Sequence, residues 1–284
     1  MNVASVMTPR SEVVVVELPG TRDDALEYLQ DREFSSVPVV KEVDGDEQYR
    51  GLLSRNALIE QPEEDQLALL MDDVPTTSAD QSLAAAADLM RRQGARRVPV
   101  VDGDSLEGIV TVTDIVEAIA TGDLPVEGEV GDVATDAVTT TYSGAPLTVA
   151  ERELAHADVP YTVVLGDDGA MAGVLTEVDV LAVARVVEGE DSTGDSIADS
   201  DDDWKWESVK AVGSRYLPTR NVQLPAGPVS EFMTEDVVTV TRSRSIRDAA
   251  QLLIRHDVEQ LPLVVGDDLS AIVLDTDLLE AVDV

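Results

Sequence analysis

The hydrophobic positions of the chain follow two different spacings. Short apolar runs rich in valine predict β-strands, and stretches whose apolar residues recur every three or four positions predict amphipathic helices. Between residues 67 and 122 these patterns follow one another in the order strand, helix, strand, strand, helix. The predicted elements of this stretch are strands at 74–77, 98–101 and 109–111 and helices at 82–92 and from 114 onward.

The same order of elements occurs four times along the chain. Pro38, Pro99 and Pro262 lie in equivalent strands of the first, second and fourth copies, and we match Thr162 of the third copy to them. A period of about 60 residues gives each copy three strands and two helices, with one sheet face left uncovered. We therefore expect the copies to pack in pairs, the first with the second and the third with the fourth. The predicted repeats are residues 1–62, 67–122, 130–187 and 229–284.

An insert at residues 188–228 separates the third and fourth copies. Its first part is polar and acidic, which is typical of a flexible linker. Its second part contains Trp204 and Trp206, and a linker does not need two tryptophans. We expect Trp204–Leu224 to dock, either as a strap over the folded repeats or onto a partner protein.

In each copy the third strand runs directly into the second helix. This junction reads Gly-Ile-Val-Thr-Val-Thr-Asp at residues 108–114 of the second copy. Thr-x-x-Asp at the start of a helix approximates a capping box, which alone would account for these residues. The junction also places a hydroxyl, a carboxylate and free backbone N–H groups at one edge of the sheet, where a ligand can bind. Both roles can hold together because they use different atoms.

Acidic residues are spread over the whole chain, whose formal net charge is −37 at pH 7. Such a surface favours solubility in concentrated salt, where the Debye length is about 3 Å at 1 M, and indicates a haloarchaeal protein. The alternatives are an acidic protein from ordinary salt or one with a basic partner. The charge opposes binding to nucleic acid and to anionic membranes. Because the sequence shows no signal peptide, no apolar run of roughly 20 residues and no cysteine, we expect a cytoplasmic protein without disulfides.

The clearest positive feature is a cluster of four arginines in the second copy. Arg91, Arg92, Arg96 and Arg97 lie between its first helix and its second strand. Because arginine binds phosphate with two parallel hydrogen bonds, the cluster predicts a phosphate site on the copy that carries the complete junction. The alternative is that these arginines complement the end of the helix and pair with nearby acids.

The repeated order of elements resembles the CBS domain, a regulatory repeat. The resemblance is carried by the Val-Pro-Val-Val strand before an acidic turn and by the Gly-h-h-Thr-x-x-Asp junction, in which h is apolar. The openings Met7-Thr8-Pro9 and Met233-Thr234 are also similar, and the resemblance covers nearly the whole chain except about 188–228. It implies an α/β fold of four CBS repeats arranged as two pseudo-two-fold paired (Bateman) modules.

Pairs of CBS domains typically bind adenosine-containing ligands, so the resemblance implies AMP, ADP, ATP or S-adenosylmethionine as the ligand and no required cofactor. By position, Asp114, Asp179 and Asp277 would accept hydrogen bonds from ribose hydroxyls. Thr111 and Thr176 would contact ribose or phosphate. Val74, Val138 and Val237 would flank the base, and the other ligand-binding candidates are Arg96, Arg97, Val98 and Val112.

The four copies depart from the motif to different degrees. The first has Ser54 and Ala57 where the motif has threonine and aspartate, and the fourth has Leu274 at the threonine position. We therefore expect the site of the second copy to be occupied first, followed by those of the third, the fourth and the first.

The sequence contains no phosphate loop, dinucleotide fingerprint, nucleophile elbow or metal-binding helix motif, so we expect no catalysis and no metal. The predicted function is regulatory: an adenine nucleotide binds between paired repeats and modulates an unknown partner protein, and the chain is a possible homodimer. The alternative is an interaction scaffold with vestigial clefts that uses Trp204–Tyr216 as its contact surface.

Overall fold

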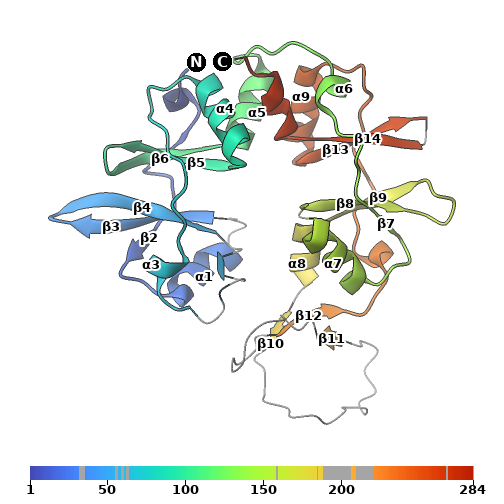
Figure 1. Cartoon of the computed structure of the whole chain (residues 1–284), viewed down its shortest axis with the longest axis horizontal. Helices are drawn as coiled ribbons and strands as arrows, with labels where there is room; N and C mark the ends of the chain where they lie inside the picture. Colours follow the sequence, from blue (N-terminus) through green and yellow to red (C-terminus); the bar gives the residue numbers. More distant parts are fainter. Residues whose placement is uncertain are drawn as a thin grey trace, which may run out of the picture. The chain divides into compact units, whose positions relative to one another are not determined.

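The computed structural model describes residues 1–283 apart from 32–35, 55–56, 59–60, 62–63, 158, 184, 188–205, 209–220 and 267. It is a mixed α/β structure (Figure 1). The chain divides into two compact units. The first consists of Met1–Val133, Arg242–Gln260 and Val273–Val284, and the second of Ala134–Thr241 and Leu261–Ile272. The fourth repeat therefore contributes its helices to the first unit and most of its β-hairpin to the second.

The second repeat shows how the local sequence sets each element. Helix α4 (Leu83–Gln93) begins after Ser82, whose side chain accepts a hydrogen bond from the backbone N–H of Ala85. The helix ends at Gly94, which has a φ of +62°. Its buried residues recur at helical spacing and face the core. Strands β5 (Arg97–Asp102) and β6 (Ser105–Thr111) and helix α5 (Val112–Thr121) follow.

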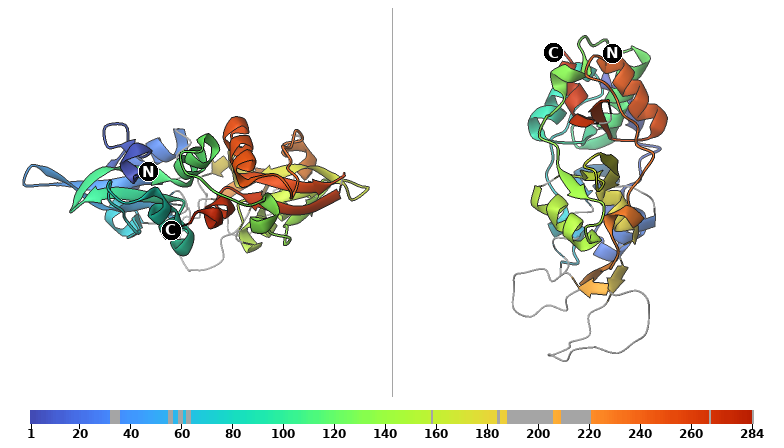
Figure 2. Two further views of the ribbon diagram at one scale, coloured as in Figure 1. Left: turned by 90° about the horizontal axis from the view of Figure 1, so that it is seen from above. Right: turned by 90° about the vertical axis from the view of Figure 1, so that its right-hand side faces the viewer.

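In the other repeats, the elements that the structure describes follow one another in the predicted order. The first contains β2 (Val16–Leu18), α1 (Arg22–Asp31), β3 (Ser36–Val43) and β4 (Asp46–Ser54). The third contains β7 (Thr140–Tyr142), α7 (Leu147–Ala157), β8 (Tyr161–Leu165), β9 (Met171–Thr176) and α8 (Glu177–Val183). The fourth contains α9 (Ile246–His256), β13 (Gln260–Val265), β14 (Asp268–Leu274) and the 3-10 helix η3 (Asp277–Ala281). The β3–β4 hairpin, in blue, extends well beyond the rest of its sheet (Figure 2).

Four predicted elements are shorter or displaced. The segment 74–77 forms only an isolated bridge between Thr77 and Val100, and the fourth repeat has only the bridge between Val240 and Leu263. The sequence also predicts first strands at 13–16 in the first repeat and near 138 in the third, and these strands lie at Val16–Leu18 and Thr140–Tyr142. These first strands pair with a single parallel neighbour, so few hydrogen bonds hold them in a ladder. In the second repeat Pro75 also lacks a donor.

The repeats pair by exchanging their opening segments. Strand β1 (Thr8–Pro9) of the first repeat pairs with β6 of the second through Thr8 and Ile109, and Asp72 of the second returns to Leu52 of the first. The third and fourth repeats repeat this exchange, and its bridges are Thr135 with Ile272 and Val174 with Thr234. The predicted grouping of the first repeat with the second and of the third with the fourth is confirmed.

The exchange explains the glycine of the junction motif. A side chain at Gly173 would begin 2.7 Å from the carbonyl oxygen of Thr234 and 2.8 Å from the sulfur of Met233. Gly51 and Gly108 meet the opening segments of their partner repeats in the same way, with methionine sulfurs at 3.3 and 3.2 Å. The fourth repeat has the fully buried Ala271 at this position, and its partner has Ala134 where the others have methionine. The larger residue at the glycine position is thus accompanied by a smaller residue at the methionine position.

The strand register corrects our match of Thr162 to the motif proline. Val39 and Val100 lie opposite Gly51 and Gly108, and in the third repeat Val164 lies opposite Gly173. The residue before each of these valines occupies the proline position, so Val163 and not Thr162 replaces the proline. Thr162 corresponds to the core residue Val98, and both are fully buried.

The insert adds a sheet to the third repeat. Strands β10 (Arg185–Val187), β12 (Asn221–Pro225) and β11 (Trp206–Ser208) are antiparallel, with β12 in the middle. Strand β12 packs against α7 and α8, and its Leu224 is buried with Leu147 and Leu154. Docking of Trp204–Leu224 on the folded repeats is therefore confirmed for Leu224. The acidic part (188–203), Trp204 and most of the predicted contact surface Trp204–Tyr216 lie outside the described residues.

Candidate ligand-binding site

The junction of the second repeat is a complete capping box at the start of α5. The hydroxyl and the backbone N–H of Thr111 donate hydrogen bonds to Oδ2 of Asp114, at 2.8 and 2.7 Å. The N–H of Asp114 donates back to Oγ1 of Thr111 at 3.3 Å. The predicted structural role of these two residues is therefore confirmed. Because both bonds of the carboxylate end on Oδ2, the cap does not use Oδ1.

Burial dominates the electrostatics of Asp114. It raises the pKa of the carboxyl above its usual value, and the two hydrogen bonds from Thr111 oppose this shift by stabilising the charged form. The charge of Glu117 raises the pKa further, whereas that of Arg97 lowers it. Arg97 lies directly opposite Thr111 in the β5–β6 ladder, so one arginine accompanies this junction.

The third repeat reproduces the capping box without the arginine. Thr176 donates to Oδ2 of Asp179 from its hydroxyl at 2.7 Å and from its N–H at 2.8 Å. The N–H of Asp179 returns a bond of 3.2 Å to Oγ1 of Thr176. The residue opposite Thr176 in the ladder is Tyr161, which takes the place of Arg97. The third junction thus has the same hydroxyl and carboxylate but no equivalent cation.

The fourth repeat keeps the carboxylate and loses the hydroxyl. Among the described residues, only the backbone N–H of Leu274 donates to Asp277, at 2.8 Å. Burial and the neighbouring charges of Glu280 and Asp275 raise the pKa of Asp277 to about 6, although the Leu274 bond lowers it. The element that follows is the 3-10 helix η3, a correction to the expected α-helix, and its N-cap residue Thr276 makes no side-chain cap bond.

The first repeat has the weakest junction. The N–H of Ala57 donates to the hydroxyl of Ser54 at 3.1 Å, which keeps half of the cap. Ala57 is buried and offers no carboxylate. A ribose would therefore find no acceptor at this position, in agreement with the sequence.

The arginine cluster divides into residues with different partners. Arg91 and Arg92 both pair with Asp88 on the same helix, at 2.9 Å, so the alternative interpretation holds for them. Arg96 points elsewhere: its guanidinium binds Asp275 and Glu259 of the fourth repeat. Arg97 remains beside the junction, as its position in the ladder and its effect on Asp114 show.

The predicted valines fall into two groups. Val98 and Val112 are core residues with 0% and 1% of their surface exposed, so any contact they make with a ligand involves backbone atoms. Val74, Val138 and Val237 are partly buried and precede the first strand or bridge of their repeats.

Sequence reasoning missed Asp275 and Glu259. Asp275 is one of the few buried polar residues, with 4% of its surface exposed. It occupies the position of Val112 in the junction of the fourth repeat, and an aspartate at a core position is the signal that could have identified it.

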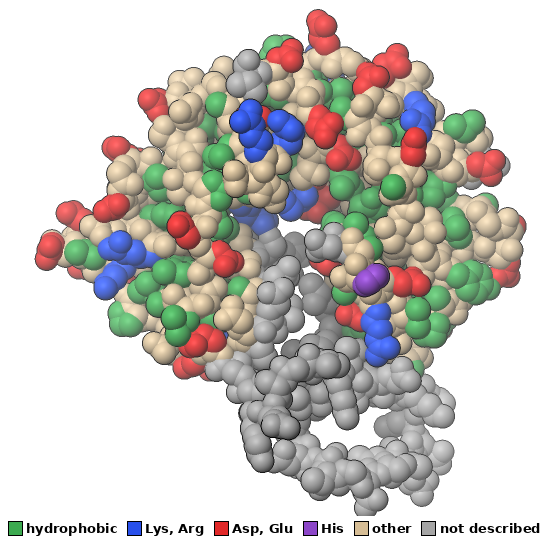
Figure 3. Space-filling model, in the orientation of Figure 1, with side chains coloured by type: hydrophobic (Ala, Val, Ile, Leu, Met, Phe, Trp, Pro, Cys, Tyr) green, Lys and Arg blue, Asp and Glu red, His purple; other side chains and the backbone are tan. Residues whose placement is uncertain are grey.

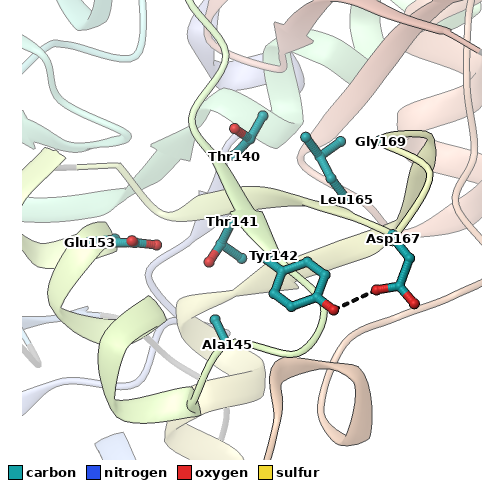
Figure 4. A pocket seen from close by; sticks show the side chains of 9 residues that line it. Thr140, Thr141, Tyr142, Ala145, Glu153, Leu165, Asp167 and Gly169 are labelled. Carbon is teal, nitrogen blue, oxygen red and sulfur yellow. Dashed lines mark hydrogen bonds between the residues drawn. The ribbon is translucent and has the colours of Figure 1, made fainter.

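Two hollows lie away from these junctions, at equivalent places in the first and third repeats. The larger, of about 640 Å³, lies between the end of β7, helix α7 and the β8–β9 turn, and the smaller, of about 290 Å³, lies beside β2 and α1. In the larger one Tyr142 donates a hydrogen bond to Asp167, and Glu153 faces the hollow from α7 (Figure 4). None of the residues predicted to bind a ligand lines either hollow.

Acidic side chains are scattered among apolar and other side chains over the described part of the face shown in Figure 3. Within the described part of the chain, no three His, Asp or Glu side chains are grouped so that they could hold a metal ion. None of the helices in that part is both long enough and apolar enough to cross a bilayer.

The chain is similar to several archaeal proteins. It is 24% identical over 279 residues to an uncharacterised protein of Methanocaldococcus jannaschii, a match that covers 98% of this chain and 61% of the relative. A conserved protein of Pyrococcus horikoshii, known from its crystal structure, is 26% identical with a TM-score of 0.69, and the match covers both chains fully. A second M. jannaschii protein, described as a putative archaeal homologue of γ-AMPK, has a TM-score of 0.69 at 17% identity over 99% of both chains and shows the fold alone.

These relatives come from other archaea, so they lend no support to a haloarchaeal source. The model of the CBS domain matches residues 3–64, 67–121, 130–185 and 229–284, which together make up most of the chain. With four such matches and four repeats of one architecture, the chain belongs to the CBS domain family.

Proposed function

We propose that this protein is a regulatory sensor of adenosine-containing nucleotides and that the second repeat carries its principal site. CBS domain pairs commonly bind adenosine nucleotides in regulatory roles. The observation that carries the proposal for this chain is the junction of the second repeat, where Thr111, Asp114 and Arg97 come together. In the third repeat Tyr161 replaces the arginine, and in the fourth Leu274 replaces the threonine.

Each group has a chemical role in this proposal. Oδ1 of Asp114, which the cap does not use, accepts a hydrogen bond from a ribose hydroxyl. Arg97 and the positive end of α5 attract the phosphate, and Thr111 positions it. Val74 flanks the base. In a chain of net charge −37, this local positive charge is what allows an anionic ligand to dock.

The regulated partner is a protein that distinguishes the ligand-bound from the ligand-free form, because a ligand shifts an equilibrium only through different affinities for the two states. The role is regulatory and non-catalytic, and the chain acts in the cytoplasm, as a homodimer, in concentrated salt. The acidic surface supports the last of these points.

Isothermal titration calorimetry of the full chain with AMP, ADP, ATP and S-adenosylmethionine in concentrated potassium chloride tests the proposal. Asp114→Asn keeps an oxygen that can cap Thr111 but loses the charge, and we expect it to weaken nucleotide binding about tenfold. Asp277→Asn is the matched control, and we expect the same nucleotide to bind it as it binds the wild type.

Two results would overturn the proposal. The first is the absence of binding below millimolar concentration for all four ligands, which would favour an interaction scaffold. The second is unchanged affinity in Asp114→Asn, which would place the ligand at another junction.

A further inference from the structure

Arg96 joins the second repeat to the fourth through a cluster of three charged side chains. Its Nη1 donates to Oδ1 of Asp275 at 3.0 Å and its Nη2 to Oδ2 at 2.7 Å, which makes a bidentate pair. Nη2 also lies 2.9 Å from Oε1 of Glu259. All three residues belong to the first compact unit.

This pair differs from the other arginine pairs of the cluster. Arg91 and Arg92 bind Asp88 three and four residues away on one exposed helix surface. Arg96 and Asp275 are 179 residues apart in the chain, and the side chain of Asp275 is only 6% exposed. Planar two-point binding to a buried carboxylate is among the stronger interactions of arginine. The 37% exposure of the Arg96 side chain leaves it accessible to a second anion.

The backbone explains how Arg96 connects two junctions. Its carbonyl oxygen accepts a hydrogen bond from the N–H of Val112, the first residue of α5. In the fourth repeat the carbonyl of Glu259 accepts from Asp275 in the same way, so Arg96 and Glu259 occupy equivalent positions. The second repeat has an arginine where the fourth has a glutamate, and the arginine side chain extends to the carboxylates of the fourth repeat.

The location of Asp275 makes the fourth repeat depend on this contact. It replaces the buried Val112, and a buried carboxylate without a partner is strongly unfavourable. Asp275 lies two residues before the start of η3, which packs against α4 of the second repeat. Whatever removes Arg96 from Asp275 therefore acts on the packing of the fourth repeat on the second.

We propose that Arg96 is a phosphate-sensitive latch: it holds Asp275 and Glu259 when the second repeat is empty and turns to the phosphate when a nucleotide occupies that repeat. This inference rests on the nucleotide site proposed above. The backbone of Arg96 is bonded to Val112, the residue after Thr111, so the base of its side chain lies beside the junction. In this proposal the side chain turns from one anion to the other by changing rotamer. Binding then loosens the contact of η3 with α4, and this is the change that a partner protein detects.

The latch predicts opposite effects for its two sides. The latch contact competes with the phosphate, so removing the charge of Asp275 releases Arg96 and strengthens binding, whereas removing Arg96 weakens it. A contact that is only structural would give no such opposition of sign.

Calorimetric titration of the full chain with AMP tests the inference in Asp275→Asn, Glu259→Gln, Arg96→Gln and the control Asp88→Asn. We expect Asp275→Asn to bind AMP about five- to tenfold more tightly and Arg96→Gln to bind it about tenfold more weakly. Glu259→Gln alters a side chain that is 61% exposed, so it folds in any case, and we expect it to bind AMP about twofold more tightly. The control is expected to bind AMP as the wild type does.

Adenosine serves as the second probe because it lacks the phosphate. Its affinity is expected to be the same in the wild type and in Asp275→Asn. Unchanged or weaker AMP binding in both Asp275→Asn and Glu259→Gln, or an equal gain for adenosine, overturns the latch while the nucleotide site stands. Failure of the wild type to bind AMP, ADP, ATP or S-adenosylmethionine overturns both.

Discussion

The second and fourth repeats carry the same aspartate at the same position of their junctions, yet the two carboxylates have different neighbours. Asp114 accepts two hydrogen bonds from Thr111 and has the positive charge of Arg97 nearby. Asp277 accepts one backbone bond and is surrounded by Asp275 and Glu280, and its pKa rises to about 6. One carboxylate has an arginine nearby, and the other has further carboxylates nearby.

The difference shows that the electrostatic environment of a motif residue depends on its neighbours. The fourth repeat has Leu274 where the second has Thr111, so it lacks the hydroxyl. It has Asp275 where the second has Val112, which adds a buried charge that must be neutralised by Arg96 from another repeat. The fourth repeat therefore has a buried carboxylate that pairs with an arginine of the second repeat. Four predictions test this contrast, from the largest expected effect to the smallest.

The largest effect is expected at the glycine position of the junction, where the second repeat has Gly108 and the fourth has Ala271. Gly108→Ala places a methyl group against the backbone carbonyl of Thr8, closer than side chains normally approach, so we expect a loss of about 3 kcal/mol in the free energy of unfolding. Ala271→Gly in the fourth repeat removes a buried methyl group and should cost about 1 kcal/mol. Urea denaturation measures both, and equal losses would contradict the difference in packing.

The next effect concerns the ion cluster. Arg96→Ala leaves Asp275 buried without its cation, and we expect a loss of about 2 kcal/mol in the free energy of unfolding. Arg91→Ala removes an exposed pair with Asp88 and should cost less than about 0.5 kcal/mol. Denaturant titration of the two variants side by side makes this comparison, and a similar small loss in both would show that Asp275 is not dependent on Arg96.

The third prediction concerns pH. Since the folded-state pKa of Asp277 is raised to about 6, the folded protein binds more protons than the unfolded chain between pH of about 4 and 6. The contribution of Asp277 to stability therefore falls as the pH rises through this window. We expect Asp277→Asn to abolish that fall and to gain about 1–2 kcal/mol on the wild type between pH 4 and 7, with solvent screening taken into account. Thermal unfolding across this range measures it, and parallel curves would contradict the assignment.

The smallest effect is expected from the cap itself. Thr111→Val removes the hydroxyl that completes the capping box, at a cost of about 1 kcal/mol in the free energy of unfolding. The reverse change, Leu274→Thr, supplies a hydroxyl donor near Asp277 and should lower the pKa of that carboxyl. NMR titration of Asp277 provides the measurement, and an unshifted titration would show that the fourth junction cannot accept the cap.

Local patterns in the sequence were sufficient to predict the main helices and the pairing of the repeats. The helix predicted at 82–92 is α4, because Ser82 and Gly94 mark its ends and its apolar positions have a helical period. The capping role of Thr111 and Asp114 was visible for the same reason: it depends on residues three apart.

Features that depend on distant residues could not be predicted in this way. The pairing of Arg96 with Asp275 spans 179 positions and has no local signal. The residue of the third repeat that stands at the proline position could not be predicted either, because Thr162 and Val163 are equally compatible with a strand. Only the pairing of Val164 with Gly173 shows that it is Val163. The 3-10 form of η3 follows from a cap that Leu274 cannot make.

The exchange of opening segments has a consequence for handling the protein. Strand β6 lies between β5 and β1, so the outer edge of this sheet is occupied by Thr8 and Pro9. A sheet edge that loses its neighbour presents unpaired N–H and C=O groups to other molecules and promotes aggregation. Deleting the first nine residues would therefore expose an unpaired, aggregation-prone edge of β6 in the second repeat. Pro9 is well suited to end the ladder because proline has no N–H to donate.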